Sequence, residues 1–303
     1  MGERVSVRVP ATGANLGCLF DCGAIAFSLY LDIHLTPRVD DQIVASYRGV
    51  NGDRVGGGAD NLIARTIRDT LRGWGKTRGF DLEIENQIPV GCGVGSSAAA
   101  IVGALAASHR LANRTLFDEE IVSLATRHEG HPDNVAAAWH GGFTVAVESA
   151  GRVLSYSCPL PEPLGLVLVV PDYALPTEEA RKVLPSHYAR ADAVHNLQRA
   201  AVLTAQLFSG KAELHRCFFD DRWHQSFRSH LVPGLPEVLA LHHPDLLGIC
   251  LSGAGPSLLA FTRGDAAAIG ELIQKTLLEK NVQSRVYAVQ ADQRGAKGWM
   301  LPH

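Results

Sequence analysis

The stretch Ile88-Pro-Val-Gly91-Cys-Gly93-Val-Gly95-Ser96-Ser97-Ala-Ala-Ala100 decides how this chain is interpreted. Three glycines alternate with other residues, two serines follow, and a segment rich in alanine then predicts a buried helix over residues 97–111. Glycine lets the backbone adopt positive φ and approach a ligand closely. A helix N-terminus adds unpaired N–H groups and the positive end of the helix dipole. The stretch therefore predicts a loop that binds phosphate.

A tight strand-to-helix turn with a serine cap would use the same glycines. The alternating strand expected over residues 80–88, the serine pair and the small residues that follow favour phosphate binding over that alternative. Serine hydroxyls can bind phosphate oxygens or Mg²⁺, which prefers oxygen ligands.

The rest of the chain mixes strands and helices without a regular alternation. Apolar spacing of two predicts a strand at Val5, Val7 and Val9, and helical spacing predicts a helix that Asp118 would cap. Further helices are expected over residues 60–72, 177–184, 190–208 and 265–280, and strands over 142–147, 164–170, 246–251, 258–261 and 285–289. This pattern favours an α+β fold over a doubly wound sheet. Prolines 159, 161 and 163 place a boundary near residue 155.

Composition narrows the class of partner and the compartment. Lys+Arg is 28 against Asp+Glu 31, a net charge of −3, so a nucleic-acid partner is disfavoured. The N-terminal residues enter a strand at once, which predicts no signal peptide, and the longest apolar runs are too short to span a bilayer. Six scattered cysteines without a CxxC pair suggest reduced thiols. We therefore expect a cytoplasmic protein with no membrane partner.

Three glycine segments together resemble the three motifs of the GHMP kinase superfamily, in the same order. They are Pro10-Ala-Thr-Gly-Ala-Asn15-Leu-Gly17, Gly93-Val-Gly95-Ser-Ser-Ala98 and Leu251-Ser-Gly-Ala-Gly-Pro-Ser257. The resemblance implies an N-terminal domain over residues 1–155, with a left-handed βαβ unit and the ATP phosphate loop. It also implies a ferredoxin-like C-terminal domain over residues 156–303, with ATP bound between the two.

Within the superfamily, four segments look like the homoserine kinase family. They are residues 15–21, the run His128-Glu-Gly-His-Pro-Asp-Asn-Val135, residues 177–185 and residues 221–228. The chain departs from the family at Gly13, where serine is usual, and at Val94, where leucine is commoner. The resemblance implies ATP-dependent phosphorylation of the L-homoserine hydroxyl to O-phospho-L-homoserine, in threonine biosynthesis. A homodimer is a further expectation, since family members are often dimers.

The resemblance also implies the residues of the site. Arg181 and Arg228 would grip the substrate carboxylate, which suits the guanidinium fork. The ammonium and hydroxyl ends would be held by Asn15, Asp21, His131 and Asp133. Nucleotide binding is expected from Asn61, Pro89, Val90, Gly91, Cys92, Gly93, Val94, Gly95, Ser96, Ser97, Gly253 and Gly255.

Catalysis is expected to depend on placement more than on covalent work by the protein. We expect Asp133 and Asn134 to orient the hydroxyl, although Asp133 could instead accept its proton. Thr177 would assist near the γ-phosphate. Ser97 and Glu129 are the candidate Mg²⁺ ligands, because one hydroxyl and one carboxylate leave room for waters and phosphates.

Two other functions stay open at this point. Another kinase of the superfamily could act on a mevalonate-like alcohol, in which case Asp21 and His131 would need other roles. A ligand-binding protein of the same fold without catalysis is the second alternative.

Overall fold

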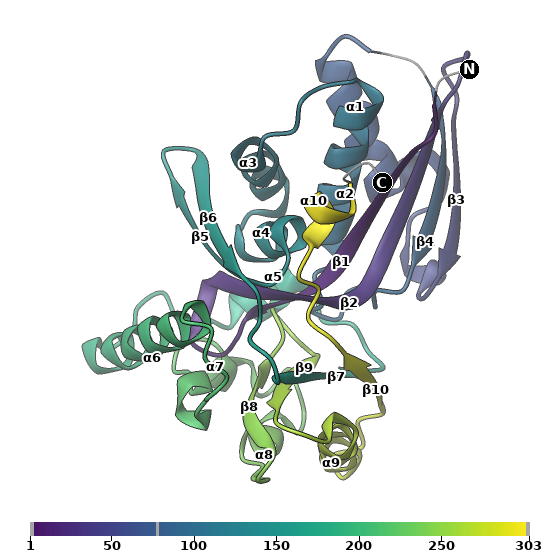
Figure 1. Cartoon of the computed structure of the whole chain (residues 1–303). Helices are drawn as coiled ribbons and strands as arrows, with labels where there is room; N and C mark the ends of the chain where they lie inside the picture. Colours follow the sequence, from purple (N-terminus) through teal and green to yellow (C-terminus); the bar gives the residue numbers. More distant parts are fainter. Residues whose placement is uncertain (1–2, 77–78, 301–303) are drawn as a thin grey trace.

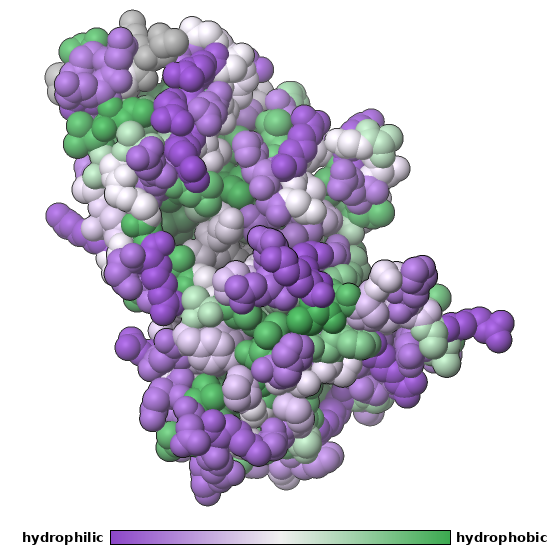
Figure 2. Space-filling view, turned by 180° about the vertical axis from the view of Figure 1, so that it is seen from behind, coloured by the Kyte–Doolittle hydropathy of each residue, from purple (hydrophilic) through white to green (hydrophobic). Residues whose placement is uncertain are grey.

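The computed structural model describes residues 3–76 and 79–300. The first and last residues of the two expected domains, 1–2 and 301–303, therefore lie outside the described residues. Two sheets, each covered by helices, lie one above the other in Figure 1. Hydrophilic residues cover most of the face shown in Figure 2, with smaller apolar areas between them. No helix within the described ranges is long and apolar enough to cross a membrane.

The first sheet contains six strands, of which the longest, β2, lies at its centre. Its members are β1 (Val5–Asn15), β2 (Leu19–Pro37), β3 (Ile43–Gly49), β4 (Phe80–Asn86), β5 (Phe143–Ser149) and β6 (Arg152–Cys158), in the order β3-β4-β2-β5-β6 with β1 paired to β2. Four helices accompany it: α1 (Leu62–Gly73), α2 (Ser96–Leu111), α3 (Asp118–Glu129) and α4 (Asp133–His140). Strand β3 pairs in parallel with β4, and α1 connects them, which makes the expected βαβ unit.

The second sheet has the order β10-β7-β9-β8 and is antiparallel. Its strands are β7 (Gly165–Pro171), β8 (Leu246–Leu251), β9 (Leu258–Thr262) and β10 (Ser284–Val289). Helices α8 (Leu235–Leu239) and α9 (Ala266–Leu278) pack on it, and α5 (Thr177–Lys182), α6 (Arg190–Phe208) and α7 (Gln225–Arg228) lie between β7 and β8 in sequence. This strand order is ferredoxin-like. The expected α+β class is confirmed.

The chain passes between the two sheets twice. Strand β6 ends at Cys158 and β7 begins at Gly165, so the first link starts slightly beyond residue 155. After β10 the chain returns to the first unit, where α10 (Gly295–Trp299) packs on β1 and α4. Asp292, which is buried, accepts hydrogen bonds there from Tyr30 Oη (2.9 Å) and Trp299 Nε1 (3.0 Å). The expected division near residue 155 assigns this returning segment to the second unit, although α10 packs on the first, and the domain bounds stay a prediction.

One local prediction is wrong. Asp118 does not cap α3, because Phe117 occupies the N-cap position and Asp118 is the first helical residue. The Asp118 carboxylate instead accepts a hydrogen bond from Trp139 Nε1 (3.1 Å) and pairs with Lys297. Three short 3-10 helices, η1 (Gly52–Arg54), η2 (Gly58–Asp60) and η3 (Arg216–Phe219), complete the described elements.

Candidate active site

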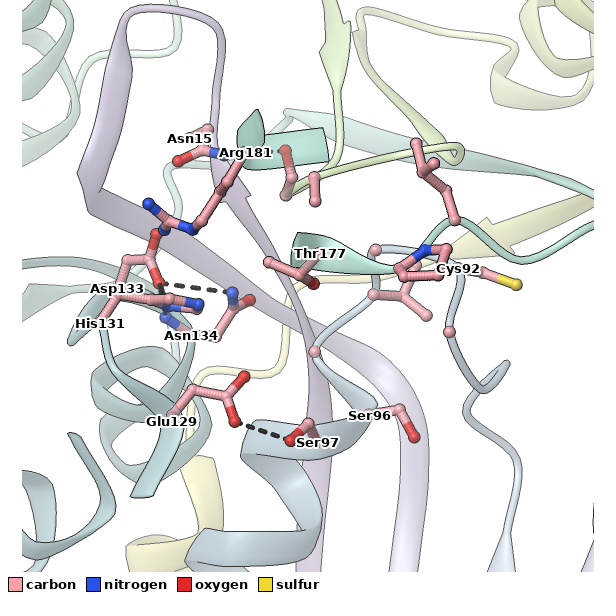
Figure 3. Close-up of a pocket in the computed structure, with 18 of the residues that line it drawn as sticks. Asn15, Cys92, Ser96, Ser97, Glu129, His131, Asp133, Asn134, Thr177 and Arg181 are labelled. Atoms are coloured by element: carbon pink, nitrogen blue, oxygen red, sulfur yellow. Dashed lines mark hydrogen bonds and ion pairs between the residues drawn. The ribbon is translucent and has the colours of Figure 1, made fainter. Parts of the chain in front are cut away.

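The predicted site residues meet in one cleft between the two units (Figure 3). Its walls are the glycine loop at 91–97, the N-terminal ends of α2, α4 and α5, and the turn at 253–254. Most of the expected residues line it: Asn15, Asp21, Gly91, Cys92, Gly93, Val94, Gly95, Ser96, Ser97, Glu129, His131, Asp133, Asn134, Thr177, Arg181, Arg228 and Gly253. Residues far apart in the chain are thus brought to a single cavity.

The glycine loop is held by its carbonyl groups. The carbonyls of Gly91 and Cys92 accept from Leu175 N (3.0 Å) and Ser257 N (3.3 Å). Those of Gly93 and Val94 accept from Ser252 Oγ (2.8 Å) and Thr12 N (3.2 Å). None of the backbone N–H groups of residues 91–95 donates to another described residue. The loop therefore presents free donors at the start of helix α2, as a phosphate site requires.

Glycine is required at two positions of this loop, both for its backbone conformation and because no room exists there for a side chain. Gly93 and Gly95 have φ of +75° and +69°, a region that other residues rarely adopt. A Cβ on Gly93 would lie 2.6 Å from the Gly255 carbonyl oxygen and closer still to that of Ser252. A Cβ on Gly95 would collide with the Thr12 hydroxyl. Only glycine lets the neighbouring segments approach this closely.

Ser97 and Glu129 point toward each other from α2 and α3, beside the loop (Figure 3). Ser97 Oγ donates to Glu129 Oε2 at 2.7 Å. Burial raises the pKa of Glu129, although the Ser97 hydroxyl and the nearby His131 act against this. A partly buried carboxylate with only one described hydrogen-bond donor is a group that a cation would stabilise.

His131, Asp133 and Asn134 form a hydrogen-bonded group at the start of α4. Asp133 Oδ1 accepts from His131 Nδ1 (2.9 Å) and from Asn134 N (2.6 Å). Burial opposes a charge on His131, but the bond to Asp133 and the Glu129 carboxylate outweigh it and raise the pKa of His131. Asn134 Oδ1 accepts from the buried Thr12 hydroxyl at 2.7 Å. The Asn134 side chain is therefore fixed in one orientation.

Opposite charges face each other at the other end of the cleft. Arg181 makes a two-pronged ion pair with Asp21, with nitrogen–oxygen distances of 2.6 and 3.0 Å. Asn15 orients this end, because its side chain accepts from Asp21 N (3.0 Å) and donates to the Gly253 carbonyl (2.8 Å). Arg228 is almost fully buried beside them, and burial together with the nearby Arg181 lowers its pKa to about 10.

Four expected nucleotide-binding residues do not line this cleft. Asn61 caps α1 by accepting from Ile63 N (2.8 Å). Val90 bonds through its N–H to Asn51 Oδ1 (3.1 Å), and Gly255 packs against Gly93. Pro89 lines a neighbouring cavity of about 350 Å³ that shares Cys92 with the cleft.

Thr12 and Leu175 were missed by sequence analysis. Each acts through a backbone N–H that orients the loop, and the Thr12 side chain also fixes Asn134. A backbone contact between distant segments leaves no signal in the sequence. Thr12 could have been found only because it lies inside the first glycine motif.

The chain is similar to known kinases over almost its whole length. The family of GHMP kinases N-terminal domains matches residues 61–142. Homoserine kinase of Solibacter usitatus is 41% identical over 271 residues, covering 89% of this chain and 88% of the relative. Homoserine kinase of Deinococcus radiodurans is 37% identical and covers 96% and 95%. The chain belongs to the homoserine kinase family.

Solved structures agree with this membership of the homoserine kinase family. The crystal structure of homoserine kinase from Cytophaga hutchinsonii matches with a TM-score of 0.84 at 28% identity, covering 97% of each chain. A mevalonate kinase structure matches with a TM-score of 0.62 at 16% identity, which shows a shared fold alone. The two-domain GHMP kinase fold is confirmed, and the chain is a kinase for which ATP is the phosphoryl donor.

The packing of the loop predicts that Gly93→Ala weakens ATP binding. The new Cβ cannot avoid the Ser252 and Gly255 carbonyls, and the left-handed conformation costs about 1–2 kcal/mol for a non-glycine residue. We expect the Kd of an ATP analogue, measured by calorimetry, to rise at least about tenfold. Gly73→Ala is the control, because a Cβ there meets no atom within 4 Å. Equal affinities for the two variants would contradict the assignment of the loop.

Proposed function

We propose that this kinase transfers the γ-phosphoryl group of ATP to the hydroxyl of L-homoserine. The observation that carries the proposal is the pairing of Asp21 with Arg181, beside Arg228, at the end of the cleft away from the phosphate loop. A zwitterionic amino acid can replace that pair, with its carboxylate on the arginines and its ammonium on Asp21. A mevalonate-like acid has no ammonium group, so its carboxylate would leave Asp21 without a partner.

The groups at α4 favour orientation of the hydroxyl over proton abstraction. Asp133 Oδ1 already accepts hydrogen bonds from His131 Nδ1 and from Asn134 N, an arrangement that suits a group which orients the hydroxyl. In the reaction the hydroxyl oxygen forms a bond to the γ-phosphorus, the bond to ADP breaks, and the hydroxyl proton leaves to solvent or phosphate. Asn134 and Asp133 hold the hydroxyl in line, and Thr177 at the start of α5 assists on the phosphate side.

The residues around the loop fit ATP and Mg²⁺. The free N–H groups of residues 91–95 suit the phosphates, and the adjoining cavity at Pro89 and Cys92 suits the nucleoside. Ser97 and Glu129 would hold Mg²⁺, which prefers one or two protein oxygens and completes its shell with water and phosphate. When bound, the ion neutralises phosphate charge.

The product, O-phospho-L-homoserine, places the enzyme in threonine biosynthesis. A cytoplasmic location is part of the proposal and is supported by six cysteines that are all free. The intact Ser97, Glu129, Asp133 and Asn134 argue against a binding protein that has lost catalysis.

An ADP-release assay with homoserine, mevalonate and galactose tests the proposal. We expect turnover with homoserine only, and activity confined to a substrate without an α-amino acid group would contradict it. Arg181→Ala should raise the homoserine KM by about 10- to 100-fold, because it removes a charge-assisted bond worth about 1.5–3 kcal/mol. The KM for ATP should change little. Arg222→Ala, which removes an exposed ion pair with Asp192, is the matched control and should behave as wild type.

The Mg²⁺ site predicts a linked dependence on pH and on Glu129. Because burial raises the pKa of Glu129, protons compete with Mg²⁺ at a higher pH than for an ordinary glutamate. The Mg²⁺ concentration for half-maximal activity should therefore rise as pH falls through that raised pKa. Glu129→Gln should raise it about tenfold at neutral pH and remove the additional rise in acid. Glu119→Gln, an exposed carboxylate on the same helix, is the control; a wild-type response in Glu129→Gln would exclude this ligand.

A homodimer is supported by one apolar surface. Of the 13 large hydrophobic side chains that are exposed among the described residues, seven lie on the β5–β6 hairpin and helix α6. They are Val147, Leu154, Tyr156, Val194, Leu197, Val202 and Phe208. Val147 pairs across the hairpin with Leu154, and Tyr156 shares their face. The two elements lie on the same side of the molecule (Figure 1), and Phe208 packs on Phe143 of β5 at 5.7 Å between ring centres.

Such a surface is self-complementary when a twofold axis brings two copies together, and patches of this kind commonly mark interfaces. Leu197, 67% exposed, lies on it, whereas Leu278 on α9, 52% exposed, does not. We expect wild type and Leu278→Asp to sediment as dimers at micromolar concentration and Leu197→Asp as a monomer. A monomeric wild type, or a dimer that tolerates Leu197→Asp, would contradict this interface.

A further inference from the structure

His224 is a buried histidine that takes no part in the steps proposed above. It precedes α7 as its N-cap residue and has no exposed surface. Its Nε2 lies 2.7 Å from the Gly17 carbonyl oxygen, and its Nδ1 lies 3.1 Å from Arg228 Nη1. The imidazole thus connects the turn after β1 to an arginine of the cleft.

These two partners leave the ring a single protonation state. A carbonyl oxygen can only accept a hydrogen bond, so Nε2 must carry a proton. A guanidinium group can only donate, so Nδ1 must carry its lone pair. The ring is therefore the neutral Nε2–H tautomer. Protonation would place an N–H on Nδ1 against the N–H of Arg228 and would add a second positive charge there.

The other bonds of Arg228 show what this acceptor does. Arg228 Nε donates to the Ala180 carbonyl (3.0 Å), and Nη1 also donates to the Gly253 carbonyl (3.1 Å). The Phe20 ring lies beside both the guanidinium and the imidazole, at 5.6 and 5.3 Å. Nη2 donates to no other described residue, and Arg228 lines the cleft. The guanidinium is locked so that one nitrogen remains for a ligand.

We infer that His224 is a positioning residue for the substrate carboxylate, and that it acts only while its ring is neutral. It holds the Arg228 guanidinium in the plane that presents Nη2 to the cleft. Through its hydrogen bond to the Gly17 carbonyl, His224 also connects the guanidinium to the turn that precedes Asp21. Asp21 would receive the ammonium group. The inference rests on the proposed function, since it assigns a role in binding an amino acid.

The charges around His224 agree with a neutral ring. Burial lowers its pKa, and the adjacent Arg228 acts in the same direction, whereas Asp221 and Asp21 oppose them. Asp221 cannot serve as the proton acceptor of the ring, because its carboxylate already receives Asn196 Nδ2 and the N–H groups of Trp223, His224 and Gln225. The nearby Cys18 thiol is uncharged, since burial raises its pKa to about 12.

Three variants separate positioning from a merely structural role. His224→Phe keeps a ring beside Phe20 but removes the acceptor, and we expect the homoserine KM to rise about 10- to 100-fold with little change in kcat or in the KM for ATP. His224→Asn keeps an acceptor near the Nδ1 position, and its homoserine KM should stay within about threefold of wild type. His140→Asn is the control, because His140 is a partly buried histidine whose pKa is also lowered by burial, and it lies away from the cleft.

The pH profile gives a second readout with a defined sign. A lowered pKa means that the neutral ring persists below the ordinary histidine range, so the homoserine KM of wild type should rise only in acid. His224→Asn should not show that rise, while His140→Asn should. Equal acid profiles in wild type and His224→Asn, or an unchanged KM in His224→Phe, would overturn the inference.

Nitrogen-15 NMR of the wild-type histidine rings tests the tautomer without any assay of activity. We expect His224 as the neutral Nε2–H form at neutral pH, and a charged ring or the Nδ1–H form would overturn the inference even if no variant folded.

These outcomes can be told apart from a failure of the proposed function. A wild type that does not phosphorylate homoserine rejects that function, whereas an active wild type with an insensitive His224→Phe rejects only the role of His224.

Discussion

The hydrogen bonding of the carbonyl groups of residues 91–94 is the constraint on which the rest of the structure depends. A phosphate site made of backbone N–H groups requires the matching carbonyls to face elsewhere and find donors, because buried polar groups without partners are costly. Here the donors are Thr12 from β1, Leu175 ahead of α5, and Ser252 and Ser257 after β8. Three of the four lie in the second half of the chain. The loop can therefore take its shape only when both units are folded and in contact.

The second link between the units follows from the same requirement. A cleft assembled from two sheets keeps its geometry only if the sheets cannot slide, and a single connecting segment after Cys158 would allow rotation. The return of the chain after β10 supplies a second attachment. Asp292 accepts hydrogen bonds from the Tyr30 hydroxyl, the Trp299 indole and the N–H groups of Arg294 and Gly295. One buried carboxylate therefore fixes the returning segment to the first sheet. The long strand β2, which carries Tyr30, also carries Asp21 near its N-terminal end.

Prediction from the sequence worked best for elements that a single local segment specifies. Helix α6 has the predicted bounds, and the glycine loop lies between β4 and α2 as its pattern indicates. Strands β2, β3 and β6 and helices α4, α7, α8 and α10 were not predicted. For β3 and α10 the reason is that their partners, β4 for the first and β1 with α4 for the second, lie far away in sequence. Asp118 shows the limit of local rules: an N-cap residue and a first-turn acid look alike until Trp139 and Lys297 are in place. Resemblance placed most site residues in the cleft, but Asn61 caps α1 and Thr12 acts through Asn134.

Under the proposed function, the pairing of Asp21 with Arg181 would make a polar cleft both stable and selective. A charged group that is partly withdrawn from water is stable only with a partner, so the site keeps its own ion pair when no substrate is bound. A zwitterion exchanges that pair for two new pairs and leaves no charge unmatched. A ligand with only a carboxylate would pair with Arg181 and leave Asp21 without a partner. A ligand with only an ammonium group would leave Arg181 without a partner. In this proposal, selectivity for an amino acid would arise from the penalty on the wrong ligand as much as from contacts with the right one. Arg228 does not share this exchange, because its partners are neutral acceptors that remain in place. In the proposed function, its positive charge would set the direction in which the zwitterion enters.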